Sequence, residues 1–291
     1  MSIKDITVII TSFKSENKIR RCLKSIDSDC RVINVENSNN KEYKTKIESD
    51  FKNVTCILSG ENIGYGKGNN IALKKIKSKY ALILNPDAEL FSESINNFLK
   101  IAELNPDFSM IVPSTVNNKN NLKSYNLTSH NDIFNHLVDI DKKTLKTVRG
   151  HAMFLNVSKF KDIGFFDENI FFFLEETDLA MRLLKSNKKI YYYAPIIIYH
   201  EGGKSHQTKI NHEMEISRNW HWMWSTFYYN TKYKGFLITF IIFMPKLFTS
   251  FFKFLFFLIV KNKEKKQIYY HRFSGLMNSI MGKSSWYRPK V

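Results

Sequence analysis

The first two hundred residues alternate short apolar runs with amphipathic segments, and this alternation constrains the fold more than any other feature. The apolar runs have the length of strands, whereas the segments between them carry apolar residues at helical spacing. Predicted strands cover residues 6–11, 31–35, 54–58, 81–84 and 190–200, and predicted helices cover 14–25, 69–79, 92–104 and 174–185. Such alternation predicts an α/β fold around a mostly parallel sheet flanked by helices. Ligands bind to such sheets beyond the carboxyl ends of the strands.

The polar stretch Asn117–Lys143 interrupts the alternation, and we interpret it as a long surface loop that helps to shape a binding site. A soft boundary between residues 205 and 233 separates the alternating part from the rest of the chain. The sequence therefore predicts an α/β domain over residues 1–205 and a helical, basic region over residues 206–291.

Positive charge is concentrated near the C-terminus, where Lys204–Val291 holds 15 Lys and Arg against 3 Asp and Glu and carries +12 of the net charge of +17. Such a region suits nucleic acid or an anionic membrane surface. Neighbouring apolar residues favour the membrane, and the sequence has no recognised nucleic-acid motif. The three cysteines lack metal-type spacing and no signal peptide opens the chain, so we expect a cytoplasmic protein with reduced thiols.

Gly235–Val260 is almost wholly apolar and long enough to span a membrane as a helix. Lys246 and Lys253 interrupt it, and Pro245 divides it near its middle. These three residues fit a helical hairpin that lies in the membrane interface at least as well as they fit a span. The basic cluster Lys261–Lys266 that follows would be attracted to anionic headgroups. A pair of core helices joined by a charged turn is the alternative.

A carboxylate follows the most apolar predicted strand, at the edge of the sheet where ligands bind. The strand at 81–84 ends in Asn85-Pro86-Asp87, with Glu89 two residues on. Carboxylates are good ligands for hard divalent cations, which can bridge the phosphates of a nucleotide diphosphate. Pro-Asp is equally common in turns, so the local sequence leaves a metal site and a simple turn open.

Three glycines at alternate positions, Gly64, Gly66 and Gly68, precede the predicted helix at 69–79. Glycine lets backbone approach a ligand closely. The spacing matches neither the Walker loop nor the dinucleotide fingerprint, so a ligand-binding loop and a flexible turn both stay open.

An acidic triplet, Glu175, Glu176 and Asp178, follows an aromatic run and begins the predicted helix at 174–185. The helix dipole favours acids at this end, which is one explanation for the triplet. The aromatic run indicates instead a partly dry site, where a carboxylate pKa rises into the range of a general base. His200, at the end of the last predicted strand, is a candidate metal ligand or phosphate contact.

Together and in this order, the motifs resemble the family 2 glycosyltransferases, specifically the rhamnosyltransferase-like members that build bacterial surface polysaccharides. The resemblance runs from about Ile6 to Ser205. It rests on the Thr-Ser-Phe end of the first strand, the acid-Asn-Ser after the second, the segment Asn62–Asn69, Asn85-Pro86-Asp87, Gly150 before a short apolar strand, the acidic triplet and the final His200.

The resemblance implies a GT-A fold, in which residues 1–110 bind the nucleotide and residues 111–205 hold the acceptor and the catalytic base. Asp87 and His200 would hold Mg²⁺ or Mn²⁺ against the diphosphate. Glu176 would be the base, where the family usually has Asp, with Glu175 and Asp178 as positioning residues or substitutes. The nucleotide-binding positions implied by the resemblance are Thr11, Phe13, Glu36, Asn37, Asn62, Gly64, Asn69 and Asn85.

The implied reaction is an inverting transfer of a sugar from a nucleotide-diphosphate donor, with dTDP-rhamnose favoured, to a saccharide acceptor carried on a polyprenyl diphosphate. It would serve O-antigen, capsule or cell-wall polysaccharide synthesis. The basic tail would hold the enzyme at the inner face of the plasma membrane, as a peripheral or hairpin-anchored protein. A UDP-hexose donor would use much the same residues. A non-catalytic, membrane-associated nucleotide-sugar-binding protein is the other alternative, because Asn85 and Glu176 depart from the family pattern.

Overall fold

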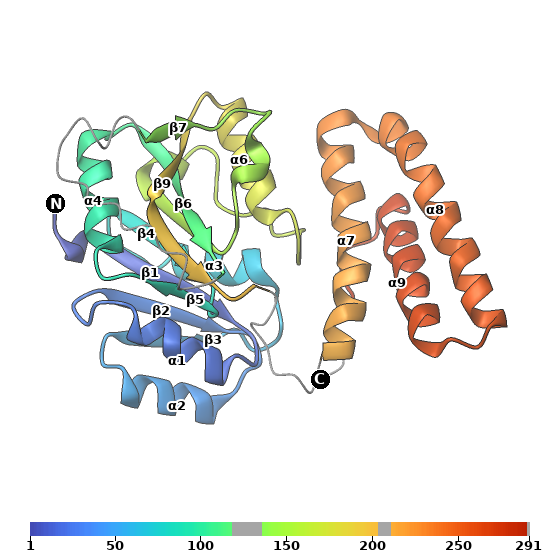
Figure 1. The fold of residues 1–291 in the computed structure, drawn as a ribbon, viewed down its shortest axis with the longest axis horizontal. Helices are drawn as coiled ribbons and strands as arrows, with labels where there is room; N and C mark the ends of the chain where they lie inside the picture. The colour runs from blue at the N-terminus through green and yellow to red at the C-terminus, as the bar shows by residue number, and fades with distance from the viewer. Residues whose placement is uncertain (118–135, 203–210, 290–291) are drawn as a thin grey trace. The chain divides into compact units, whose positions relative to one another are not determined.

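The computed structural model describes residues 1–117, 136–202 and 211–289 (Figure 1). The chain forms two compact units. The first comprises Met1–Ile63, Lys67–Phe166 and Glu176–His206, and the second comprises Gly64–Gly66, Asp167–Glu175 and Gln207–Val291. Two short segments of the α/β part of the sequence therefore group with the C-terminal helices.

The first unit is built on one sheet. Its strands are β1 (Ile6–Ser12), β2 (Arg31–Glu36), β3 (Val54–Leu58), β4 (Tyr80–Leu84), β5 (Ala88–Leu90), β6 (Phe108–Val116), β7 (Leu137–Asp139), β8 (Ala152–Asn156) and β9 (Lys189–His200). They lie in the order β3-β2-β1-β4-β8-β6-β9-β5, with β7 paired to β9. The first four strands of this order are parallel, as are β6 and β9, whereas β8 is antiparallel to both its neighbours. The predicted mixed, mostly parallel α/β fold is confirmed.

The central strands β1 and β4 are buried along their whole length. Both are continuous runs without polar alternation, which is typical of strands covered on both faces. Aromatic rings whose centroids lie 4.8 to 5.7 Å apart pack the core next to β4; they belong to Tyr80, Phe98, Phe108 and Phe154. Because β1 and β4 are parallel neighbours, the residues that follow them reach the same edge of the sheet.

The helices of this part are α1 (Glu16–Lys24), α2 (Lys41–Asp50), α3 (Tyr65–Leu73), α4 (Ser94–Leu104) and α6 (Glu175–Lys185), with short 3-10 turns at Ile3–Asp5, Leu145–Thr147 and Val157–Phe160. Helix α3 begins within the glycine segment, earlier than predicted. A Cβ at Gly68 would lie 2.5 Å from Cγ2 of Thr11, so this glycine lets α3 approach β1 closely. Helix α4 begins at Ser94, two residues later than predicted, with Glu93 in the capping position.

Part of the polar stretch interpreted as a surface loop forms a strand. Residues 137–139 are strand β7, which pairs antiparallel with β9. Residues 118–135 of that stretch lie outside the described residues.

The second unit contains three helices, α7 (Asn211–Lys234), α8 (Phe236–Ile259) and α9 (Lys263–Ile280), which pack against one another (Figure 1). Its core is a cluster of Met223, Phe227, Phe243 and Leu276. A Cβ at Gly275 would lie 2.3 Å from the Trp220 carbonyl oxygen, so glycine allows α9 to pack directly on the α7 backbone.

Helix α8 runs unbroken through Pro245, so the predicted hairpin within Gly235–Val260 is wrong. A proline removes one backbone hydrogen bond and can be accommodated where neighbouring helices support the chain. Here α7 and α9 both pack on α8. Within the described residues, α8 is the one helix long and apolar enough to cross a membrane. Only 11% of its most apolar 18-residue stretch is buried.

Candidate functional site

Asp87 and His200 face each other at the edge of the sheet. Strands β5 and β9 pair antiparallel with Ala88 opposite His200, which brings the preceding residue, Asp87, beside the imidazole. Oδ1 of Asp87 lies 3.3 Å from Nε2 of His200. Both atoms are buried, and within the described chain neither has a hydrogen-bond partner. Because buried polar atoms rarely lack partners, the two atoms fit a pair of ligands to a divalent cation.

His151 supports His200 through ring stacking, with ring centroids 4.4 Å apart. Its Nε2 lies 2.5 Å from Oγ1 of Thr115. Burial, and next the neighbouring His200, lower the pKa of His151 to about 3, so the ring is neutral near pH 7. His151 can therefore orient His200 without adding positive charge beside a cation. The sequence analysis missed His151, although it directly precedes the buried strand β8.

Two protein ligands leave room for a substrate. Among the described residues, no three His, Cys, Asp or Glu side chains form a group that could hold a metal ion. Mg²⁺ takes about six ligands and keeps several of its waters, so the remaining positions would go to water and diphosphate oxygens. Asn85 builds the turn before Asp87: its N–H donates to the His151 carbonyl at 2.9 Å, and its carbonyl accepts from the N–H of Ala88 at 3.1 Å.

The structure also joins several of the predicted nucleotide-binding residues. Oγ1 of Thr11 donates to Oδ1 of Asn69 at 2.9 Å, and both residues are buried. The buried Asn37 donates from its backbone to the Ser12 carbonyl at 2.8 Å. Phe13, which is half-buried, follows at the end of β1. The ends of β1 and β2 and the first turns of α3 therefore come together, as the resemblance implies.

Other predicted residues have local roles. The carboxylate of Glu36 accepts hydrogen bonds from the backbone and hydroxyl of Ser38 and from the N–H of Asn40 at 2.6 to 3.1 Å, so it caps its own turn. Glu89 lies 3.8 Å from Arg21. Asn62 is half-buried just before α3.

Gly64 has a φ of +89°, and a Cβ there would lie 2.5 Å from the Phe171 carbonyl oxygen. The positive φ and the close approach of the Phe171 carbonyl each require glycine at this position. Gly64 and Phe171 belong to the second unit, so this glycine fixes the path of the chain within that unit.

Glu176 lies on the first turn of α6, beside Gly150. A Cβ at Gly150 would lie 3.4 Å from Oε2 of Glu176, and Thr177 donates to Oε1 at 3.1 Å. Burial raises the pKa of Glu176 and outweighs the hydrogen bonds and the charge of Arg149, which lower it. A raised carboxylate pKa is suited to general base catalysis near neutral pH. Because Gly150 adjoins Glu176 and His151 adjoins His200, consecutive residues link the candidate base to the candidate metal ligands.

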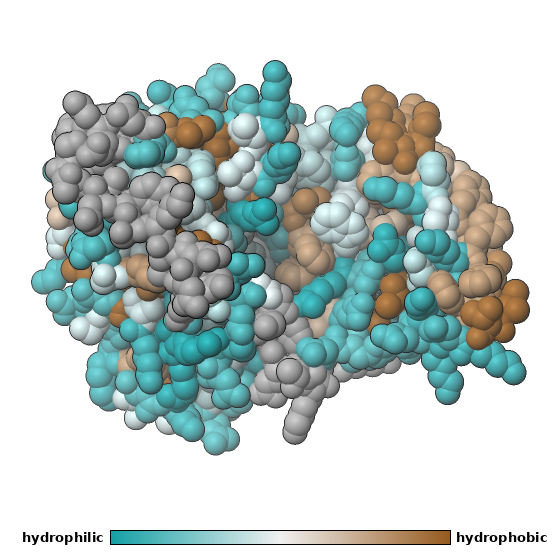
Figure 2. All heavy atoms as spheres, viewed as in Figure 1, coloured by the Kyte–Doolittle hydropathy of each residue, from teal (hydrophilic) through white to brown (hydrophobic). Residues whose placement is uncertain are grey.

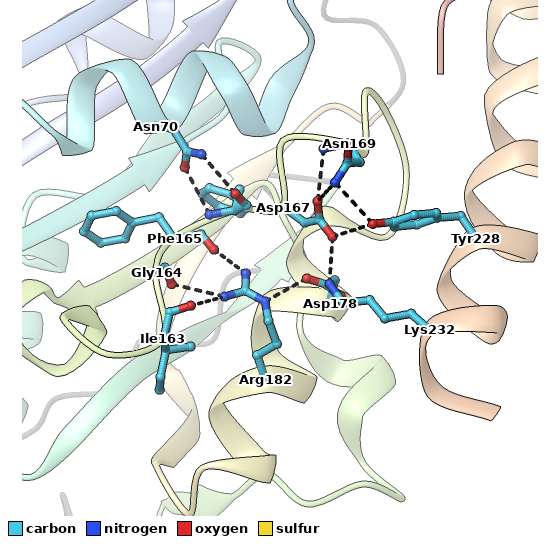
Figure 3. Close-up of polar contacts among 11 residues, drawn as sticks. Asn70, Ile163, Gly164, Phe165, Asp167, Asn169, Asp178, Arg182, Tyr228 and Lys232 are labelled. Atoms are coloured by element: carbon cyan, nitrogen blue, oxygen red, sulfur yellow. Dashed lines mark hydrogen bonds and ion pairs between the residues drawn. The ribbon is translucent and has the colours of Figure 1, made fainter. Parts of the chain in front are cut away.

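Asp178 is engaged in an ion pair with Arg182. Its fully buried carboxylate accepts from Nε of Arg182 at 2.8 Å. Figure 3 shows that the same guanidinium donates to three successive carbonyls, those of Ile163, Gly164 and Phe165. Asp178 thus orients Arg182, and the Arg182 guanidinium holds the backbone of residues 163–165, which precede the acidic triplet, in place. The sequence analysis missed Arg182, although it stands four residues after Asp178 on one helix face.

Two further anchors hold the loop ends. In the first unit, the side-chain amide of Asn70 makes two hydrogen bonds of 3.0 Å with the backbone of Phe166. In the second unit, Asp167 accepts from Tyr228 at 3.0 Å and from Lys232 at 2.7 Å (Figure 3). Burial raises the pKa of Asp167, but hydrogen bonds from Lys232 and Asn169 outweigh it, and the net shift is downward. Glu175 is buried and groups with this second unit.

Replacing Arg182 with Ala should destabilise the first unit by about 3–5 kcal/mol, because it leaves the Asp178 carboxylate buried and unpaired. Denaturant unfolding monitored by circular dichroism measures this loss. Arg20→Ala is the matched control: Arg20 forms an exposed pair with Asp50, so its loss should cost about 1 kcal/mol or less. Equal losses in both variants would show that Arg182 does not organise the loop.

Comparison with known sequences gives one family. The sequence model described as Glycosyl transferase family 2 matches residues 7–164. The chain is 26% identical over 198 residues to the low-salt glycan biosynthesis hexosyltransferase Agl10 of Haloferax volcanii, a match that covers 64% of each chain. It is 23% identical over 209 residues to the rhamnosyltransferase WbbL of Escherichia coli, covering 64% of this chain and 79% of WbbL. The match thus spans less than two thirds of the length of Agl10.

Solved structures share the fold. The mannosyltransferase PcManGT from Pyrobaculum calidifontis, in complex with GDP-Man and Mn²⁺, superposes with a TM-score of 0.58 at 11% identity, covering 96% of this chain and 88% of that one. Residues 1–349 of S. aureus TarS superpose with a TM-score of 0.53 at 13% identity, covering 97% of this chain and 93% of that one. The predicted GT-A fold is therefore confirmed.

Proposed function

Because this chain belongs to glycosyl transferase family 2, whose model matches residues 7–164, we propose that it transfers a sugar from a nucleotide-diphosphate donor to a saccharide acceptor with inversion at the anomeric carbon. One observation carries the proposal. Two consecutive residues, Gly150 and His151, contact both parts of the candidate site. Gly150 lies against Glu176, whose carboxylate has a raised pKa, and His151 stacks on His200 of the Asp87–His200 pair, whose two facing atoms have no hydrogen-bond partner in the described chain. This combination supplies what a metal-assisted inverting transfer uses, a base for the acceptor and a cation for the leaving diphosphate.

Asp87 and His200 would hold the cation, Mg²⁺ or Mn²⁺, through Oδ1 and Nε2. When bound, such a cation stabilises negative charge on a leaving diphosphate. The Mn²⁺ in the mannosyltransferase of the same fold supports a divalent cation here. The residues at the ends of β1 and β2 and on α3, with Thr11 fixed on Asn69, would bind the nucleotide.

Glu176 would accept the proton of the acceptor hydroxyl. As that proton leaves, the hydroxyl oxygen forms a bond to the anomeric carbon, and the bond from this carbon to the diphosphate oxygen breaks. Attack opposite the leaving group inverts the configuration. The raised pKa of Glu176, caused chiefly by burial, makes its carboxylate a stronger base than an exposed one.

For the donor we propose dTDP-rhamnose, with a UDP-hexose as the alternative. The rhamnosyltransferase WbbL supports the first, and the hexosyltransferase Agl10 supports the second. The low-salt glycan biosynthesis hexosyltransferase Agl10 also supports a role in polysaccharide synthesis. We propose that the acceptor is carried on a polyprenyl diphosphate and that the enzyme works on the cytoplasmic face of the membrane, because α8 exposes apolar side chains in the basic C-terminal region.

The proposal is tested by measuring nucleotide-diphosphate release from dTDP-rhamnose, UDP-glucose, UDP-galactose and UDP-N-acetylglucosamine, each with Mn²⁺, Mg²⁺ or EDTA. We expect one donor to be turned over and EDTA to abolish the turnover. Turnover that EDTA leaves unchanged would contradict the Asp87–His200 cation site. Failure of calorimetry to detect binding of any of the four donors in the presence of Mn²⁺ would contradict the transferase itself.

A further inference from the structure

A basic pocket lies between α8 and α9 of the second unit. Two lysines of α8, Lys246 and Lys253, and Arg272 of α9 line it, and its volume is about 270 Å³. The remaining lining residues are Pro245, Thr249, Ser250 and Tyr269, so the pocket presents three cations and three hydroxyls and has no carboxylate in its wall.

Neutral groups hold the three cations in place. Arg272 donates to Oδ1 of Asn219 on α7 at 3.2 Å. Lys253 lies 3.4 Å from the hydroxyl of Tyr269. Lys246 lies over the ring of Phe243, 4.5 Å from its centroid. Within the described parts of the chain, none of the three forms an ion pair. Three like charges around one pocket repel one another, and an anion bound there would relieve this repulsion.

The pocket adjoins an exposed apolar stripe on α8. Intervals of four and seven residues keep the members of the stripe on one helix face, and they are 51% to 77% exposed: Leu237, Ile241, Phe248, Phe252 and Ile259. Figure 2 shows apolar residues at the surface along this helix. Pro245, four residues after Ile241, is exposed and lines the pocket. Through Pro245 the pocket wall adjoins the edge of the stripe.

The lysines indicate how α8 meets a bilayer. Lys246 and Lys253 lie in the middle of the helix Phe236–Ile259, so a transmembrane α8 would place them in the hydrocarbon, where charges are costly. Helix α9 packs on α8 and would bring Arg272 with it. A helix that lies flat instead sinks its stripe into the acyl chains and keeps all three cations at the depth of the headgroups.

We propose that this pocket binds the phosphate of an anionic phospholipid headgroup while the stripe of α8 inserts among the acyl chains. The inference rests on the proposed membrane location and is independent of the transfer reaction. An Arg guanidinium binds phosphate in bidentate fashion, and lysines and hydroxyls supply further donors.

Co-sedimentation of the full chain with vesicles tests the pocket. Vesicles are made of phosphatidylcholine with or without phosphatidylglycerol. The combined variant Lys246→Gln, Lys253→Gln should bind the anionic vesicles about thirty-fold more weakly than the wild type. The matched control, Lys24→Gln with Lys52→Gln, removes the same charge from exposed positions of the first unit and should weaken binding about three-fold or less. Equal losses in the two variants would overturn the pocket, because only net charge would then matter.

Two further measurements test the membrane location and the identity of the anion separately. A wild-type chain that binds neither kind of vesicle would overturn the membrane location and the pocket together, whereas the donor assay above would be unaffected. Inorganic phosphate, titrated by calorimetry without vesicles, should bind at least about tenfold more weakly than the anionic vesicles do, because it lacks the acyl chains. Inorganic phosphate that binds as tightly and releases the protein from vesicles would overturn the assignment to a lipid.

Discussion

Asp87→Asn should lower the transfer rate by about a thousand-fold or more at saturating donor and Mn²⁺. The asparagine keeps the shape of the side chain but removes its charge, which leaves His200 as the remaining protein ligand of the pair. Loss of cation stabilisation at the leaving diphosphate amounts to several kcal/mol, and each 1.4 kcal/mol, approximately, is tenfold in rate. Initial rates of nucleotide-diphosphate release measure the effect.

Asp107→Asn is the matched control for this variant. Its side chain is 85% exposed and pairs with Lys159 on the surface, so we expect the wild-type rate. Calorimetry adds a readout that does not depend on turnover: Mn²⁺ should tighten the binding of the nucleotide diphosphate to the wild type and not to Asp87→Asn. A variant that keeps both the rate and the Mn²⁺ effect would show that the cation is held elsewhere.

Glu176→Gln should lower kcat by about a hundred-fold to ten-thousand-fold and leave KM for the donor nearly unchanged, because the glutamine cannot accept the proton of the acceptor hydroxyl. The pH dependence gives a second readout. The base works ionised, so the wild-type rate should rise with pH through the pKa of Glu176 and then level off. Since burial raises this pKa above the ordinary value of 4.5, the inflection should lie above that value and be absent from the variant.

Glu176→Asp and Glu103→Gln complete the series. Aspartate restores a carboxylate about 1 Å further back, so part of the lost rate should return together with the pH inflection. Glu103 is exposed on α4, and its change should have no effect. If the inflection persists in Glu176→Gln, another carboxylate is the base, and Glu175 is the next candidate because Asp178 is paired with Arg182.

The elements predicted best are those in which a short run of consecutive residues is buried. Strands β1 and β4 are buried on both faces, so every residue in them is constrained and the pattern shows without knowledge of the fold. The order of the polar motifs was equally informative, because several of them stand at the carboxyl ends of parallel strands and so reach the same edge. The candidate cation ligands Asp87 and His200 were therefore predicted as two separate motifs, and the pairing of β5 with β9 brings them together.

Predictions failed where distant packing outweighed local preference. Pro245 was expected to end a helix, but contacts with α7 and α9 carry α8 through it. Gly68 was left between a ligand loop and a flexible turn, whereas its lack of a side chain lets α3 lie against Thr11. Each outcome depends on partners that the local pattern does not contain.

By itself, the sequence determined the α/β class, the family resemblance, the residues able to hold a cation or a proton, and the concentration of charge and apolar residues near the C-terminus. The tertiary structure decided which of these residues meet. It placed His151 against His200 and Gly150 against Glu176, committed Asp178 to Arg182, and brought Arg272 beside two lysines of α8. Composition and periodicity report which face of an element is buried, but a site needs side chains from several elements at distances that only their packing sets.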